Sequence, residues 1–128
     1  MYKRQYLTHE GEIIKKYKVA LGFAPVGHKE YRGDGRTPEG LYRIDRRNEN
    51  SRYHLSLGIS YPDRLDKEHA KSLGKHPGGD IFIHGEPNTK AERNAMPDWT
   101  HGCIAVKDRE MEDIFAMVEL GTLIYIRA

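Results

Sequence analysis

The stretch IFIHG, residues 81–85, is a short apolar run that ends in a histidine–glycine pair. Its consecutive apolar residues would point to both faces of a strand, which is typical of a strand buried in a sheet. Pro77-Gly78-Gly79 breaks the chain just before it. We therefore expect a central, buried strand with His84 held at its end.

A second histidine–glycine pair adjoins the single cysteine of the chain, in DWTHGCI, residues 98–104. Cys103 follows His84 by 19 positions (103 − 84). A thiol with a pKa of about 8.5 is only slightly ionised at neutral pH, and a histidine within about 3 Å can accept its proton. The two stretches together predict a thiol nucleophile and its base.

His84 is the better base of the two histidines, because the end of a buried strand holds a side chain steadily. His101 is then a loop-shaping or substrate-facing group. Gly102 would let the backbone approach a substrate closely, and the amides of Gly102 and Cys103 could serve as oxyanion donors. Trp99 could stack on a ligand or simply fill space in the packing.

Two other interpretations of the cysteine stay open. A single cysteine can be an inert, half-buried small hydrophobe. His84, His101 and Cys103 could instead bind zinc, since these residue types suit that metal. We favour covalent chemistry, because carboxylates to support a metal site are not obvious and all three ligands would crowd one loop. No metal is therefore expected.

The 128 residues predict one domain, because this length is ordinary for a single core and short for two. The net charge of +2 and the lack of long basic runs exclude a nucleic-acid groove. No apolar run has the length of a membrane span or of a secretory signal. Because Tyr2–Thr8 already has the pattern of a first strand, we expect a native leader or anchor to be missing from this chain.

The remaining chain predicts mainly short strands joined by Gly-rich loops. A hairpin with one buried face is expected over Tyr2–Thr8 and Ile13–Leu21, followed by a loop over residues 22–35. Further strands are expected at Leu41–Ile44, Tyr53–Tyr61, Ile104–Val106 and Leu123–Ile126, and a loop at Asp45–Ser51. The alternation of polar and apolar residues carries most of these assignments.

Two segments have helical spacing. Residues 65–73 carry apolar residues at helical intervals and end at Gly74, which predicts a short helix. The main helix is expected over residues 108–120, with Asp108 as its N-cap and Gly121 as its C-terminal stop. The fold class is thus mainly β with one main α-helix and one short helix.

Several motifs resemble those of L,D-transpeptidases of the YkuD family. His84-Gly85 and Thr100–Ile104 resemble its active-site signature, in the same order and at similar spacing. Thr37–Ile44 is similar to its Thr-Pro-x-Gly-x-aromatic-x-Ile segment, and the opening hairpin is similar to its first two strands. The resemblance covers essentially the whole chain, and Tyr53–Pro62 is nearer the YafK-like branch of the family.

The resemblance implies a β-sandwich of two mixed sheets with a helix packed on it. By position, it makes Cys103 the acylated nucleophile and His84 its base, with the Gly85 carbonyl orienting the imidazole. Thr100 and His101 then belong to the surrounding shell. The chain departs from the family pattern soon after the cysteine, where many members have Arg or Asn and this chain has Ala105, Val106, Lys107 and Asp108.

The implied substrates are peptidoglycan stem peptides of the meso-diaminopimelate type, cleaved with loss of the terminal D-alanine. An amine, such as a D-amino acid or an envelope protein, or water would accept the acyl group. The family implies inhibition by carbapenems, no cofactor, and a place in the bacterial cell envelope or periplasm. Expected substrate-binding residues are Trp99, Thr100, Tyr61 and Arg36, with Arg43 and Lys107 as further cations. The alternatives are a hydrolase that cuts an existing stem linkage and a non-catalytic wall-binding domain.

Overall fold

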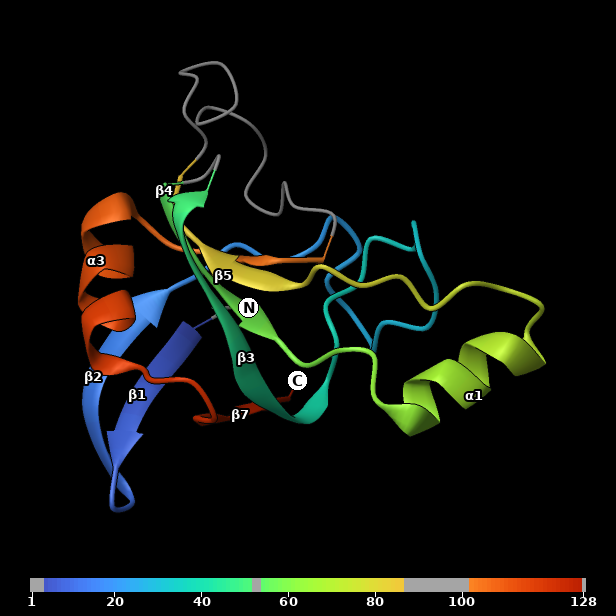
Figure 1. Ribbon diagram of the computed structural model, residues 1–128, viewed down its shortest axis with the longest axis horizontal. Helices are drawn as coiled ribbons and strands as arrows, with labels where there is room; N and C mark the ends of the chain where they lie inside the picture. Colours follow the sequence, from blue (N-terminus) through green and yellow to red (C-terminus); the bar gives the residue numbers. More distant parts are fainter. Residues whose placement is uncertain (1–3, 52–53, 87–101, 128) are drawn as a thin grey trace.

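The computed structural model describes residues 4–51, 54–86 and 102–127 (Figure 1). Its elements, in chain order, are β1 Arg4–His9, β2 Glu12–Lys18, β3 Gly40–Ser51, β4 His54–Ile59, α1 Arg64–Ser72, β5 Phe82–His84, β6 Ile104–Ala105, α3 Asp108–Met117 and β7 Leu123–Ile126. They form two sheets with two helices. The expectation of a mainly β fold of this kind is confirmed.

The larger sheet has the strand order β6-β5-β4-β3-β7. It is mixed, because β5 and β6 run parallel whereas the other neighbours are antiparallel. The smaller sheet is the antiparallel pair β1–β2. As predicted from its apolar run, β5 is an interior strand, lying between β4 and β6. Figure 1 shows α3 and the β1–β2 hairpin at one side of the larger sheet and α1 at the opposite end.

The hydrophobic core lies between the larger sheet and α3. Leu57 and Ile59 of β4 are fully buried, as are Met111 and Ile114 of α3. The two helix residues are three positions apart and so share one face. Full burial of each such side chain contributes about 2 kcal/mol. This packing holds β4 and β5 rigid at the place where the histidine–glycine pair begins.

β3 is longer than predicted, and the loop expected at Asp45–Ser51 is wrong. Residues 46–48 pair in antiparallel register with Gly58, Leu57 and Ser56 of β4. The side chains of this part of β3 are exposed, so polar side chains pay no desolvation penalty there. The backbone amides and carbonyls are satisfied by hydrogen bonds to β4. The polar composition of this segment suggested a loop, but polar residues are equally typical of an exposed strand.

The main helix is also shorter than predicted, since α3 ends at Met117 and not at residue 120. The residue at its N-cap is Lys107, whose amide donates to Glu110 Oε1 at 3.3 Å. Asp108 is not the cap. Its carboxylate instead accepts a hydrogen bond from the Glu86 amide at 2.8 Å, which ties α3 to the end of β5.

The β1–β2 hairpin forms as predicted, and its expected buried face is confirmed in part, since Leu7, Val19 and Leu21 pack against the core that contains Tyr17. Tyr17 is the buried residue of β2, whereas Ile13 and Ile14 are 63% and 52% exposed. The two-residue bridge between Ala20 and Ala105 then joins the end of the hairpin to β6. In the described part of the chain, neither helix is long and apolar enough to span a membrane.

A buried carboxylate fastens α1 to the loop that precedes β3. Asp66 accepts hydrogen bonds from Tyr42 Oη at 2.7 Å and from His28 Nε2 at 2.8 Å. His28 Nδ1 accepts from the Glu39 amide at 2.7 Å, so the ring proton is on Nε2. Asp66 also forms a capping box with Asp63 at the start of α1. This network holds the loop that leads into the Thr37–Gly40 motif, the first four residues of the Thr37–Ile44 segment.

Candidate active site

Strand pairing brings the first histidine–glycine stretch close to residues 102–105, the described residues around the cysteine. β5 and β6 are parallel, with Ile83 opposite Ile104 and His84 opposite Ala105. Cys103 lies one step before the Ile83–Ile104 pair and His84 one step after it. The two predicted reactive residues, 19 positions apart in sequence, therefore lie on neighbouring segments at the β5–β6 end of the larger sheet.

Cys103 is half-buried, and its sulfur forms hydrogen bonds with the backbone just before and within β5. Its Sγ accepts from the Phe82 amide at 3.4 Å and donates to the Asp80 carbonyl at 3.4 Å. Burial raises the pKa of the thiol, and the charge of Asp80 adds to that rise. The Phe82 amide and the positive charge of Lys29 oppose it. The thiol is therefore the stable form at neutral pH, and a base is needed to ionise it.

His84 is 3% exposed, and its ring is oriented by the next residue. Nδ1 lies 2.7 Å from the Gly85 carbonyl oxygen. A carbonyl only accepts, so the proton is on Nδ1 and Nε2 has the lone pair that can take up a proton. Burial lowers the pKa of His84, although the Gly85 carbonyl partly offsets this. At neutral pH the imidazole is neutral and suited to act as a base.

Gly102 occupies a position that only glycine fits. Its φ is +131°, and a Cβ there would lie 2.8 Å from the Arg36 carbonyl oxygen and 3.1 Å from Ile81 Cδ1. Gly22 also approaches it, because a Cβ on Gly22 would lie 3.1 Å from Gly102 Cα. The Gly22 amide donates to Thr37 Oγ1 at 3.1 Å. The Thr37–Gly40 motif thus supports the backbone directly behind the cysteine.

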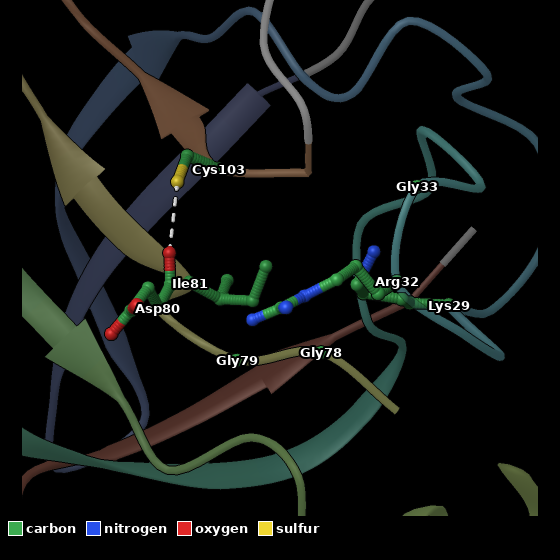
Figure 2. A pocket seen from close by; sticks show the side chains of 8 residues that line it. All are labelled: Lys29, Arg32, Gly33, Gly78, Gly79, Asp80, Ile81 and Cys103. Carbon is green, nitrogen blue, oxygen red and sulfur yellow. Dashed lines mark hydrogen bonds between the residues drawn. The ribbon is translucent and has the colours of Figure 1, made fainter. Parts of the chain in front are cut away.

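A cavity of about 290 Å³ opens beside Cys103 (Figure 2). It lies between the loop at residues 29–33 and the segment at residues 78–81. Its lining residues are Lys29, Arg32, Gly33, Gly78, Gly79, Asp80, Ile81 and Cys103. Sequence reasoning did not identify Lys29 and Arg32 as cavity residues. The Gly-rich composition of their loop predicted only irregular backbone, and no spacing linked that loop to the cysteine.

A buried ion pair shapes the loop at residues 29–36. Lys29 Nζ lies 2.9 Å from Asp34 Oδ1, and the two side chains are 3% and 4% exposed. Asp34 also accepts hydrogen bonds from the amides of Glu30, Tyr31 and Arg36. Burial alone would raise the pKa of Asp34, but these hydrogen bonds together hold it below its ordinary value. The carboxylate therefore stays charged and fixes the loop that forms one wall of the cavity.

The predicted substrate-binding residues lie in different places. Tyr61 is 3% exposed, and its hydroxyl donates to the Pro77 carbonyl at 2.8 Å, so it supports the cavity wall from behind. Arg36 does not line the cavity, and its guanidinium lies 3.4 Å from Glu30 Oε2. Trp99, Thr100 and His101 lie outside the described residues. Their roles stay predictions.

Within residues 4–51, 54–86 and 102–127, no group of three His, Cys, Asp or Glu side chains could hold a metal ion. The alternative zinc site would need His101, which lies outside these ranges. That alternative therefore stays a hypothesis.

Comparison with known proteins adds family evidence to this geometry. The sequence model of the L,D-transpeptidase catalytic domain, YkuD, matches residues 2–126. The putative L,D-transpeptidase YafK of Escherichia coli (strain K12) is 26% identical over 116 residues, which cover 89% of this chain and 40% of YafK.

Two solved structures are similar in fold. The helical cell shape determining protein Pgp2 from Campylobacter jejuni is 30% identical, with a TM-score of 0.68, over 98% of this chain and 45% of that chain. An L,D-transpeptidase from Stackebrandtia nassauensis is 12% identical, with a TM-score of 0.61, over 98% and 51%. At that identity the second likeness shows the fold alone. The chain thus spans about two fifths of the length of YafK and about half that of these two proteins.

Proposed function

The chain belongs to the YkuD family of L,D-transpeptidase catalytic domains, and we propose that it is a cysteine-dependent L,D-transpeptidase of the bacterial cell envelope. Its substrates are peptidoglycan stem peptides of the meso-diaminopimelate type. The observation that supports the proposal is the β5–β6 register: Cys103, which lines the cavity, and His84 lie on neighbouring segments two register positions apart. The similarity to the putative L,D-transpeptidase YafK supports the same class.

The acylation step uses the two neutral side chains. Nε2 of His84 takes the proton of Cys103 Sγ as the sulfur attacks the carbonyl carbon of the third stem residue. The carbon–nitrogen bond to the terminal D-alanine then breaks, and the imidazolium returns its proton to the leaving amine. The products are free D-alanine and a thioester on Cys103.

The opposing pKa shifts support general-base catalysis over a standing thiolate–imidazolium pair. Burial raises the pKa of Cys103 and lowers that of His84, so both shifts favour the uncharged forms. Charge then develops during attack, where the amides of Gly102 and Cys103 act as oxyanion donors. The Phe82 amide, 3.4 Å from Sγ, stabilises the developing negative charge on sulfur.

The thioester is resolved by whichever nucleophile reaches it. A primary amine, from a D-amino acid, a second stem or an envelope protein, gives transpeptidation. Water gives hydrolysis, the chemistry of an L,D-carboxypeptidase or of an enzyme that releases wall-bound protein. Incubating purified muropeptides with and without an added amine, and separating the products, distinguishes the two: new amide-linked products report transfer, and shortened stems alone report hydrolysis.

The proposal itself is tested by intact-mass measurement after exposure to a carbapenem. The wild-type protein should gain one covalent adduct, Cys103→Ala should gain none, and His84→Gln should react at least 100-fold more slowly. His54→Gln is the matched control, because that histidine pairs with Glu112 at the surface of α3. If the wild-type protein gains no adduct and releases no D-alanine from stem peptides, the proposed enzyme activity is wrong and the alternative of a non-catalytic wall-binding domain is favoured.

A further inference from the structure

The cavity beside Cys103 contains two cationic side chains, and they differ in what they already bind. Lys29 is neutralised by Asp34 in the buried ion pair described above. Arg32 lines the same cavity, and its residue is exposed. In the part of the chain that the structure describes, its guanidinium makes no ion pair or hydrogen bond. Figure 2 shows this side chain extending from the loop at residues 29–33 toward Ile81.

The backbone that carries Arg32 is held in place on two sides. Its amide donates to the His76 carbonyl at 2.8 Å. A Cβ on Gly78 would lie 3.3 Å from Arg32 Cα, so the opposite wall of the cavity packs directly against it. The backbone from which the guanidinium extends is therefore fixed, while the residue itself is exposed. This combination suits a group that binds a ligand.

The carboxylate nearest to this cavity does not compete for the guanidinium. Asp80 lines the cavity, but its carboxylate lies 3.2 Å from Arg46 Nη1 and is 80% exposed. Figure 2 shows it pointing away from Arg32. The Asp80 carbonyl faces the cysteine and accepts from Sγ. The cavity thus offers one uncompensated positive charge, close to the sulfur that would be acylated.

We propose that Arg32 binds a carboxylate of the stem peptide beside the scissile bond and so selects the donor. This inference rests on the proposed function, because it assumes that the acyl donor enters this cavity. A guanidinium pairs with a carboxylate through two parallel hydrogen bonds, which fixes orientation as well as position. The cavity of about 290 Å³ has room for an amino-acid-sized group and not for a whole stem.

The carboxylate can come from two places on the donor. One is the free terminal carboxylate of the D-alanine that leaves, and the other is the side-chain carboxylate of diaminopimelate. Binding of either would hold the scissile carbonyl against Sγ. Recognition of the first makes the enzyme selective for stem length, whereas recognition of the second makes it selective for the third residue.

The test measures peptide binding by calorimetry to the Cys103→Ala protein, which cannot turn over. The ligands are a synthetic stem tetrapeptide, the same peptide with a terminal carboxamide, and the same peptide with the diaminopimelate side-chain carboxylate amidated. We expect one of the two amidations to weaken binding about tenfold, the range of a charge-assisted hydrogen bond at an open site. Which amidation does so identifies the source of the carboxylate.

The decisive comparison repeats these titrations with R32Q and R32K added to Cys103→Ala. R32Q should bind all three peptides equally. R32K should keep part of the discrimination, because lysine keeps the positive charge but cannot form the two parallel hydrogen bonds of a guanidinium. Arg64→Gln is the matched control, since that side chain is 86% exposed on α1 and should change nothing. Discrimination that persists in R32Q, or that is absent from the Cys103→Ala parent, overturns the proposal.

These results are separable from the proposed chemistry. If the wild-type protein forms the carbapenem adduct but R32Q still discriminates between the peptides, the proposed function stands and the Arg32 site is wrong. If the protein binds the peptide carboxylate through Arg32 but forms no adduct, the Arg32 site stands and the proposed chemistry is wrong.

Discussion

The carbonyl oxygen of Arg36 occupies the space in which a side chain on Gly102 would begin. A Cβ at residue 102 would lie only 2.8 Å from that oxygen, and the glycine has a φ of +131°. Backbone of the loop before β3 therefore sets the position of the residue that precedes the cysteine. Any change that moves residue 102 should also move Sγ relative to His84.

Gly102→Ala should slow acylation and reduce stability at the same time. The alanine must adopt a strained backbone conformation and displace the Arg36 carbonyl, at a cost of about 2 kcal/mol or more. Carbapenem acylation rates and urea titration measure the two effects. Gly79→Ala is the control for stability, because a Cβ there would have no neighbour within 4 Å. Equal stability of Gly102→Ala and the wild type would contradict the close contact.

The pH dependence of acylation should reflect the lowered pKa of His84. Only neutral His84 can accept the thiol proton, and protonation occurs as the pH falls through the folded-state pKa. Burial sets this pKa below the ordinary histidine value of about 6.5, so the rate should be constant near neutrality and fall only at lower pH. Carbapenem acylation followed by mass between pH 4 and 8 gives the profile. An acidic limb centred above about 6.5 would refute the assignment of His84 as base.

Asp34→Asn should strongly destabilise the fold. The substitution leaves the Lys29 ammonium buried without its counter-charge and weakens three hydrogen bonds from backbone amides, so we expect a loss of about 3 kcal/mol. Urea titration measures it. Asp45→Asn is the matched control, because its pair with Arg46 is half-exposed and should contribute less than about 1 kcal/mol.

The same ion pair predicts a direction for acid sensitivity. The pKa of Asp34 is lowered in the folded protein, so its contribution is present above the unfolded-state value of about 3.9 and is lost as the pH falls through the folded-state value. The Asp34→Asn variant should therefore lose less stability between pH 5 and pH 3 than the wild type does. Thermal melting at the two pH values tests this, and an unchanged pH response would count against the charged pair.

Tyr61→Phe should act through the cavity wall and not through direct loss of a substrate contact. The change removes the hydrogen bond to the Pro77 carbonyl and should cost about 1 kcal/mol in unfolding free energy. Tyr125→Phe is the control, because Tyr125 is 66% exposed. We expect KM for a stem peptide to rise with little change in kcat, since the adjoining Gly78–Gly79 wall loosens. Unchanged stability with reduced kcat would show instead that the hydroxyl contacts the reacting groups.

Most strands could be predicted because their backbone conformation follows from local patterns. The apolar run ending at His84 became β5, and Leu123–Ile126 became β7 with the predicted bounds. The loop expected at Asp45–Ser51 failed because the partner strand that makes this segment extended comes later in the chain. The exposed Ile13 and Ile14 of the β1–β2 hairpin show the same limit, since alternation in the sequence does not reveal how far another layer covers the face it creates.

The sequence by itself determined the residue types of the candidate site and their order: one cysteine behind a glycine, and a histidine–glycine pair at the end of an apolar strand. Those features are local, because neighbouring residues specify strand, turn and side-chain chemistry. Tertiary structure alone decided that β5 and β6 pair in parallel, that the proton of His84 is on Nδ1, and that Arg32 meets Cys103 across one cavity. These relationships join segments separated by long stretches of chain or depend on burial. They are set by packing and hydrogen bonding of the whole fold, which no local pattern encodes.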